Sequence, residues 1–277
     1  MTISRREFVS LAASAAVLKG QKRIPIGLQQ TAVGKNIHDD LEETIRAVGK
    51  MGYDIIEFSA STFMSWTPAR AREVRAMLDG AGLRCRSTHN EIASFTGDGT
   101  EKAIELNSIL GSNTLVSVRG PGPVGGRGGP PAGLDAWKAF SDQLSAAMPK
   151  IRAAKMTLGF HNHEIEFQPL EGTRPIDVLT ANRDITSFHL NVGLCLKGGG
   201  DPVGFMKRCP HRVQSLLIQD YQHRANWKEI FAAAEARAGL QFYLIQRTDG
   251  LSFVERQGGD LLQFAQQDLA DFRKLHG

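Results

Sequence analysis

Short apolar runs alternate with longer segments of helical periodicity from Arg23 to the C-terminus. Eight of these runs have the length and the apolar character of buried strands. Strands that alternate with helices predict βαβ units and a parallel sheet, and eight such units predict a single α/β domain, a closed (β/α)8 TIM barrel. A doubly wound open sheet is the alternative, which is disfavoured because no Gly-x-Gly-x-x-Gly follows the first strand. The predicted strands are Ile24–Gln29, Tyr53–Phe58, Leu83–His89, Thr114–Val118, Thr157–His161, Thr186–Val192, Val213–Ile218 and Phe242–Gln246.

The segments between the predicted strands carry start and stop signals for helices. Asp39 and Asp40 suit the start of the first helix, and Gly52 suits its end. Thr67 and Pro68 suit the N-cap and the first position of the second helix. Further along the chain, one helix is predicted near Val203. The other helices with predicted bounds cover about 37–50, 100–110, 135–154, 227–238 and 260–275.

One long stretch after the fourth predicted strand consists almost entirely of Gly and Pro. It runs from Gly120 to Gly133 and also contains Val124 and Arg127. No strand or helix is compatible with that composition. We therefore expect a long loop on the face where barrel enzymes carry their active sites. A lid is the functional interpretation, and an unstructured insertion is the alternative.

The first residues differ from the rest of the chain. Ser4–Val9 resembles the twin-arginine export pattern, and the Ala- and Ser-rich run Val9–Leu18 follows it. That run is too short to span a bilayer and suits an export signal. We therefore expect a signal over residues 1–20, a barrel over 21–277 and a periplasmic or otherwise exported protein. A frayed N-terminal helix is the alternative.

The overall composition is that of a globular protein, with 42% hydrophobic and 22% charged residues. A mean hydropathy of -0.22 argues against a protein with stable membrane spans. The net charge of +4 is mild, and the basic residues form no block or basic–aromatic stripe, so we expect no nucleic-acid partner. Cys85, Cys195 and Cys209 form no CxxC pair and no disulfide framework, and we expect Cys85 and Cys195 to be buried thiols.

Polar residues are densest directly after the fifth predicted strand, in the stretch His161–Glu166. Residues i and i+2 of a strand share a face, so His161 and His163 are expected to point together. Two imidazoles and a carboxylate at a barrel mouth can hold a metal or transfer protons. We take His161 and Glu166 as catalytic candidates and His163 as a substrate-binding candidate. Histidines satisfied by loop carbonyls are the alternative.

Single polar residues end the neighbouring strands. Glu57 ends the second predicted strand, His89 the third and Arg119 the fourth. We expect His89 to be catalytic and Glu57 and Arg119 to bind substrate, with capping and salt bridging as the alternative roles. His189 is expected to face the helices and is not included. Weaker candidates follow the last two strands, namely Asp220, Tyr221, Arg247 and Asp249.

The segments that contain these candidate residues resemble the sugar phosphate isomerase/epimerase superfamily of xylose isomerase-like TIM barrels. The similarity covers nearly all of the chain after the export pattern. The His-Asn-His-x-x-Glu-Phe stretch is fairly specific to one branch of that superfamily, and the other stretches are of moderate specificity. The matching segments are Gly52–Phe58, Leu158–Phe167, Asn191–Gly193, Asp201–Val203 and Gln219–Tyr221.

The resemblance implies a cofactor and a reaction. In that superfamily a divalent metal, often manganese, magnesium, zinc or cobalt, binds residues of strands five to eight, usually Glu, Asp, His and Glu. Two acidic residues then move a proton on the carbon beside a carbonyl, through an enediolate whose oxyanion the cation and hydrogen-bond donors stabilise. The substrate is a small carbohydrate. Barrels of the superfamily often associate, so the resemblance also points to a homo-oligomer.

The metal-ligand positions of the superfamily are largely replaced in this chain. They are occupied by His161, Asn191, Leu217 and Gln246. An amide brings no charge to a cation and leucine offers no donor, so the affinity for a hard divalent cation should fall severely. Asn191 and Gln246 suit hydrogen bonds to sugar hydroxyls instead, and we expect them to bind substrate.

Three functional hypotheses remain open. The first is a sugar isomerase/epimerase-like enzyme, with a metal held differently, for example through His161, His163 and Glu166. The second is a metal-free lyase or hydrolase that acts on a keto-sugar or glycoside. The third is a non-catalytic carbohydrate-binding barrel. A phosphate substrate is disfavoured because Pro interrupts the glycine-rich stretch and removes N–H donors.

Overall fold

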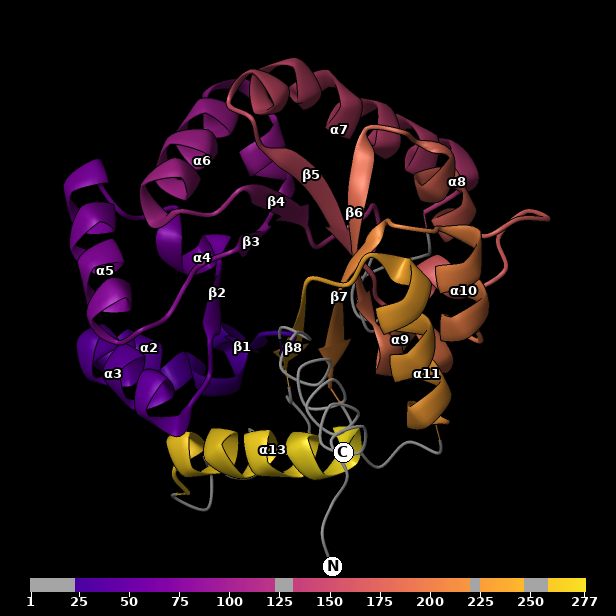
Figure 1. The fold of residues 1–277 in the computed structure, drawn as a ribbon. Helices are drawn as coiled ribbons and strands as arrows, with labels where there is room; N and C mark the ends of the chain where they lie inside the picture. The colour runs from indigo at the N-terminus through magenta and orange to yellow at the C-terminus, as the bar shows by residue number, and fades with distance from the viewer. Residues whose placement is uncertain (1–22, 123–131, 220–224, 247–258) are drawn as a thin grey trace, which may run out of the picture.

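The computed structural model describes residues 23–122, 132–219, 225–246 and 259–277 (Figure 1). Within these ranges, eight parallel strands close into one barrel in chain order, and β8 pairs with β1. The predicted (β/α)8 barrel is thereby confirmed, and the open sheet is excluded. The strands are β1 (Ile26–Gln29), β2 (Ile55–Ser59), β3 (Ser87–Asn90), β4 (Thr114–Ser117), β5 (Thr157–His161), β6 (Ile185–Asn191), β7 (Val213–Ile218) and β8 (Phe242–Ile245).

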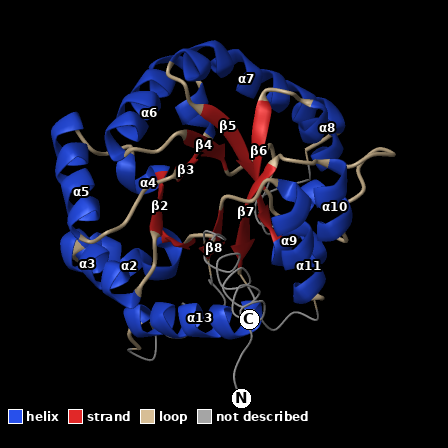
Figure 2. Ribbon diagram, in the orientation of Figure 1, coloured by secondary structure: helices blue, strands red, loops and turns tan. Residues whose placement is uncertain are grey.

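The helices form a ring around the outside of the barrel (Figure 2). The last helix, α13, contacts both α3 and α11 and so completes the ring between the two ends of the chain. The α-helices are α2 (Gly34–Asp39), α3 (Leu41–Met51), α4 (Ala60–Phe63), α5 (Pro68–Gly80), α6 (Gly97–Leu110), α7 (Leu134–Ala153), α8 (Pro175–Ala181), α9 (Val192–Lys197), α10 (Pro202–Arg208), α11 (Trp227–Ala233) and α13 (Leu261–His276). Shorter helical turns are η1 (Gln30–Val33), η2 (Ile92–Phe95) and η4 (Ile165–Phe167), and a π-helical turn, η5 (Ala234–Ala238), follows α11.

In the described ranges, every helix is too short or too polar to cross a membrane. The predicted export signal and most of the glycine- and proline-rich stretch lie outside the described residues.

The first predicted helix is two helices, α2 and α3, because Asp40 between them has an extended backbone with φ -150° and ψ 94°. Its carboxylate accepts the N–H of the third residue of α3 at 2.9 Å, which satisfies a free donor of the first turn. Gly52 ends α3 at a left-handed φ of 91°, a conformation that favours glycine. Thr67 and Pro68 open α5 as predicted.

Alternate residues of each strand face opposite sides of the barrel wall. On β2, Ile56 belongs to the large apolar core between the strands and the helices. Ile55 instead belongs to a separate apolar cluster with residues of β7 and β8, which therefore fills part of the barrel interior. The other members of this interior cluster are Leu217, Phe242 and Leu244.

Gly27 of β1 gives this interior cluster the space it occupies. A Cβ atom at Gly27 would lie 2.7 Å from Cδ2 of Leu244 and 2.9 Å from Cβ of Ile55. Apolar side chains thus fill the barrel interior next to Gly27, as in a packed barrel core. The next inward-facing residues toward the carboxyl ends of the strands are polar.

Candidate active site

Polar side chains follow the interior apolar cluster toward the carboxyl ends of the strands. Gln29 of β1 pairs in register with Glu57 of β2, and His161 of β5 pairs with His189 of β6. His89 of β3 lies between these two pairs of strands in barrel order. All five side chains are buried. The catalytic face predicted from the strand ends therefore carries a buried layer of ionisable and amide groups.

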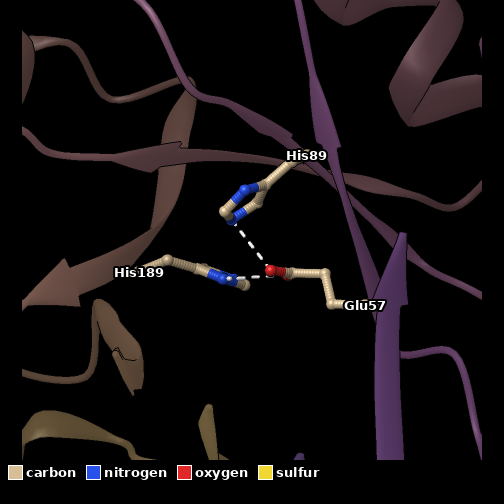
Figure 3. A group of neighbouring side chains, drawn as sticks. All are labelled: Glu57, His89 and His189. Atoms are coloured by element: carbon tan, nitrogen blue, oxygen red, sulfur yellow. Dashed lines mark ion pairs between the residues drawn. The ribbon is translucent and has the colours of Figure 1, made fainter. Parts of the chain in front are cut away.

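Glu57, His89 and His189 point toward one another inside the barrel, which we call the interior triad (Figure 3). Nε2 of His89 lies 2.8 Å from Oε2 of Glu57, and Nδ1 of His189 lies 3.5 Å from Oε1. The hydroxyl of Ser87 donates a hydrogen bond to Oε1 of Glu57. The side chain of Glu57 has no exposed surface. Glu57 thus lies against two imidazoles, and the substrate-binding role predicted for it stays a prediction.

The electrostatics of the interior triad favour an ionised carboxylate. Burial by itself raises the pKa of Glu57, but the close approach of the His89 and His189 imidazoles outweighs it and holds that pKa well below its usual range. Burial lowers the pKa of His189, and Glu57 opposes this only in part. A buried anion therefore lies beside two imidazoles, an arrangement that can hold and transfer a proton.

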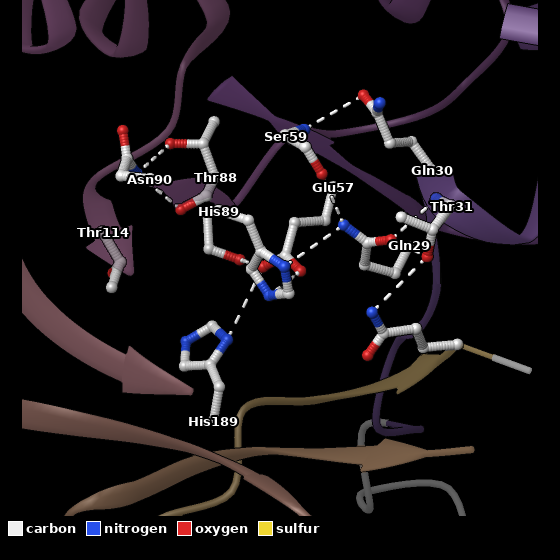
Figure 4. Close-up of polar contacts among 12 residues, drawn as sticks. Gln29, Gln30, Thr31, Glu57, Ser59, Thr88, His89, Asn90, Thr114 and His189 are labelled. Carbon is white, nitrogen blue, oxygen red and sulfur yellow. Dashed lines mark hydrogen bonds and ion pairs between the residues drawn. The ribbon is translucent and has the colours of Figure 1, made fainter. Parts of the chain in front are cut away.

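Gln29 connects the interior triad to the helical turn η1, which follows β1 (Figure 4). Its Nε2 lies 3.2 Å from Nδ1 of His89 and 3.0 Å from Oγ of Ser59. Its Oε1 accepts hydrogen bonds from the backbone N–H and the hydroxyl of Thr31, at 2.7 and 2.6 Å. These four contacts fix the orientation of the Gln29 amide. Gln29 was not among the residues predicted from the sequence.

His161 and His163 extend the imidazoles toward the barrel mouth. The His161 ring lies 4.8 Å from that of His89 and 5.2 Å from that of His163, measured between centroids. Burial, with the neighbouring His89 and His163, lowers the pKa of His161 well below its usual range. Burial also lowers the pKa of His163, to about 4. Burial therefore favours the neutral form of both imidazoles. The structure brings His161 and His163 together as predicted.

Glu166 lies in the turn η4 rather than beside the interior triad. Its Oε2 accepts the backbone N–H of His163 at 2.7 Å, and its Oε1 is buried without a hydrogen-bond partner. Burial raises the pKa of Glu166 to about 7, although backbone hydrogen bonds oppose the shift. A carboxyl group with this pKa can donate or accept a proton near neutral pH.

The positions where the superfamily binds its metal do not fit a divalent cation in this chain. Oδ1 of Asn191 accepts the N–H of Leu194 at 2.9 Å as the N-cap of α9, and its amide nitrogen donates to Gln219 at 2.8 Å. Leu217 is part of the interior apolar cluster. Nε2 of Gln246 lies 3.4 Å from Oγ1 of Thr31. One position offers no donor and another has its oxygen engaged, so we derive no step through a metal there.

Arg119 lies apart from the buried layer. Its side chain is 61% exposed, and its Nε lies 3.5 Å from a carboxylate oxygen of Glu91. Its charge acts on the neighbouring His163. A role in binding a substrate that enters the mouth stays a prediction. The weaker candidates Asp220, Tyr221, Arg247 and Asp249 lie outside the described residues.

The prediction for His189 was wrong. It lies in the barrel interior with no exposed surface and does not face the helices. The signal was available, because His189 and Asn191 are two residues apart on one strand and must share a face. Register shifts beside β6, at Leu158/Gly159 and at Phe188/His189, make that strand irregular without reversing its alternation at these positions.

The geometry defines a (β/α)8 barrel whose acid–base groups lie at the carboxyl ends of its strands. Solved structures share this fold. A sugar phosphate isomerase/epimerase from Parabacteroides distasonis superposes with a TM-score of 0.73 and 21% identity, over 91% of this chain and 94% of that one. A D-psicose 3-epimerase from Clostridium cellulolyticum gives 0.67 and 15%, over 92% and 100%. A 3-keto-D-glucoside 4-epimerase from E. coli gives 0.66 and 16%, over 91% and 100%.

No family model and no curated protein sequence matches the chain. At the identities of the structural matches, the similarity establishes the fold. The (β/α)8 barrel fold expected from the sequence is thereby shared with solved sugar epimerases.

Proposed function

We propose that the protein is a sugar isomerase/epimerase-like enzyme that moves a proton on the carbon next to a carbonyl group of a carbohydrate. The observation that carries this proposal is the buried layer of one ionised carboxylate and three imidazoles at the carboxyl ends of β2, β3, β5 and β6. The shared fold of solved sugar epimerases supports the substrate class.

The chemistry assigned to the site needs a base, an acid and donors for an oxyanion. The imidazole of His161 lies between those of His89 and His163 and burial favours its neutral form, so we assign it as the base that removes the proton. Glu166, with its pKa near 7, serves as the acid that returns a proton to the opposite position. His89, held beside Glu57, keeps a proton next to His161, whose ring lies 4.8 Å from that of His89. Gln246 and the second amide N–H of Asn191 supply donors to the oxyanion and to hydroxyl groups, and His163 binds a hydroxyl group.

A second candidate function is favoured by the state of the metal-ligand positions. Because Leu217 and Asn191 do not offer charged donors, the oxyanion must be stabilised by neutral groups of the protein or be short-lived. A β-elimination on a keto-sugar starts with the same proton abstraction next to a carbonyl and then expels a leaving group. A metal-free keto-sugar lyase would use the same base.

The experiment that tests the proposal is turnover of a panel of aldoses, ketoses and 3-keto sugars by the purified protein, with elemental analysis of the same sample. His161→Ala should abolish turnover, whereas His38→Ala, at an exposed histidine of α2, should leave it unchanged. Bound metal with chelator-sensitive turnover would support a metal-dependent epimerase. Ligand-induced thermal stabilisation without turnover of any sugar would contradict the proposal and indicate a binding protein.

The cellular location is part of the same proposal. The Ser4–Val9 pattern and the run that follows it support export by the twin-arginine route. Fractionation of a host that expresses the full chain tests this, and Arg5→Lys with Arg6→Lys should retain the protein in the cytoplasm.

A further inference from the structure

The orientation of the Gln29 amide determines which nitrogen of His89 carries the proton. Oε1 of Gln29 accepts two hydrogen bonds from Thr31, one of them from a backbone N–H that can only donate. The atom that faces His89 must therefore be Nε2 of Gln29, which lies 3.2 Å from Nδ1. A carboxamide nitrogen donates and does not accept. Nδ1 of His89 is then the acceptor, and the proton of the neutral ring is on Nε2.

The proton on Nε2 lies beside the carboxylate of Glu57, since Nε2 is 2.8 Å from Oε2. We infer that Gln29 is a positioning residue that holds His89 in its Nε2–H tautomer, so that the interior triad carries a transferable proton and not a metal ion. Gln29 acts through His89 and Glu57. The tautomer itself needs no substrate, and its role in catalysis rests on the proposed function.

The composition of the interior triad would otherwise suit a metal. One donor atom each from Glu57, His89 and His189 lie within 4.8 Å of one another, and several of these atoms are buried without hydrogen-bond partners. A metal on Nε2 of His89 would place that ring's proton on Nδ1, where it would face the donating amide nitrogen of Gln29. Two donors would then oppose each other. Turning the amide would break both hydrogen bonds from Thr31. The contacts of Gln29 therefore favour the proton over the metal.

The tautomer is tested by nitrogen NMR of the histidine rings in the ¹⁵N-labelled full chain, with His89 assigned by the loss of its signals in His89→Gln. We expect an unprotonated Nδ1 and a protonated Nε2. The same spectrum is recorded after addition of ZnCl₂, which should leave the His89 signals in place. A protonated Nδ1 in the wild-type protein, or a shift of the His89 signals on addition of zinc, would overturn the inference.

Gln29→Glu tests the cause. The carboxylate of this variant has the shape of the amide and can still accept both hydrogen bonds from Thr31. It can only accept a hydrogen bond at the position where the amide donated one to His89, so the His89 proton should move to Nδ1. Gln30→Glu is the matched control, because the side chain of Gln30 forms its hydrogen bonds within the described residues with Ser59 and Thr62. It should keep the wild-type pattern. An unchanged His89 pattern in folded Gln29→Glu would contradict the role of Gln29, and the wild-type spectrum decides the tautomer if that variant does not fold.

A kinetic readout separates this inference from the proposed function. If the protein turns over a sugar, Gln29→Glu should lower kcat by about 100-fold with little change in KM, because a misplaced proton affects the chemical step. A matching fall in both Gln29→Glu and Gln30→Glu would indicate a structural role only and would count against the inference. Absence of turnover in the wild-type protein would refute the proposed function, whereas the NMR result would still decide the tautomer.

Discussion

Glu57 is a carboxylate without exposed surface whose ion-pair partners are two imidazoles, His89 and His189. A neutral imidazole can face a carboxylate with its ring N–H and brings no permanent charge, unlike Lys or Arg. The carboxylate is therefore ionised by its surroundings without being locked in a permanent salt bridge. That state suits a site that must exchange a proton during a reaction.

Replacement of Glu57 by Gln should destabilise the protein in a pH-dependent way. Because the folded-state pKa of Glu57 lies below its ordinary value of 4.5, the contribution of its charge is present above that pH and is lost as the pH falls further. Glu57→Gln should cost about 1–3 kcal/mol at pH 7, and the cost should shrink in acid. Urea unfolding at pH 7 and pH 3.5 measures this. A cost that is equal at both pH values would show that the charge of Glu57 does not contribute.

Glu166 should give the opposite dependence. Burial raises its folded-state pKa from 4.5 to about 7, so the folded protein holds a proton that the unfolded chain releases. Stability should therefore fall as the pH rises from about 4.5 to 7, by on the order of 3 kcal/mol from this group. Glu166→Gln should remove that slope. Glu42→Gln, at an exposed position of α3, should retain it, and a wild-type slope in Glu166→Gln would contradict the assignment.

The sequence predicted several residues of the site because they end strands of a predicted barrel. His161, His163, His89 and Glu57 were found in this way. Gln29 also ends a predicted strand, so the same rule could have included it, but its role depends on the direction of its amide, which the contacts of Thr31 and Ser59 determine.

At the scale of single elements, β3 is the strand whose bounds differ most from those predicted. β3 was predicted over 83–89 but is Ser87–Asn90, and Arg84 forms only an isolated bridge with Ile55. Arg84 and Arg86 are exposed, so the strand pairs continuously only from Ser87 onward. Periodicity shows which residues are buried, but it does not show where a neighbouring strand begins to pair.

Asp40 offers a test at this scale, because it separates α2 from α3 and caps the latter. Asp40→Ala should lower the free energy of unfolding by about 1 kcal/mol through the lost cap. Asp39→Ala is the matched control, since Asp39 is the exposed partner of Lys35 and its change should have little effect. Thermal unfolding of both variants measures the difference. Equal effects would show that the cap does not contribute.

At the scale of the whole molecule, closure of the barrel is the feature that the sequence determined best. Eight alternating units leave few other ways to bury every strand on both faces. What the count of units could not predict is which side chains meet across the barrel. The interior apolar cluster and the interior triad bring together residues of β2 and β3 with residues of β6 to β8, far apart in sequence.

The tight packing of the interior can be tested at Gly27. Gly27→Ala would force a methyl group against Leu244 and Ile55 and should cost about 1–3 kcal/mol. Gly34→Ala is the matched control, because nothing lies within 4 Å of its Cβ position and its backbone is right-handed helical. That variant should be neutral or slightly stabilising. Equal unfolding midpoints for the two variants would contradict a filled interior.

The central claim is that this barrel transfers protons next to a sugar carbonyl with its own acid–base groups. Its most direct test is proton NMR of a panel of ketoses and 3-keto sugars incubated with the chelator-treated protein in D₂O. The account predicts that the wild-type protein exchanges deuterium into one sugar at the carbon beside the carbonyl, and that His161→Ala does not. Sugars that bind the wild-type protein but show no such exchange would contradict it.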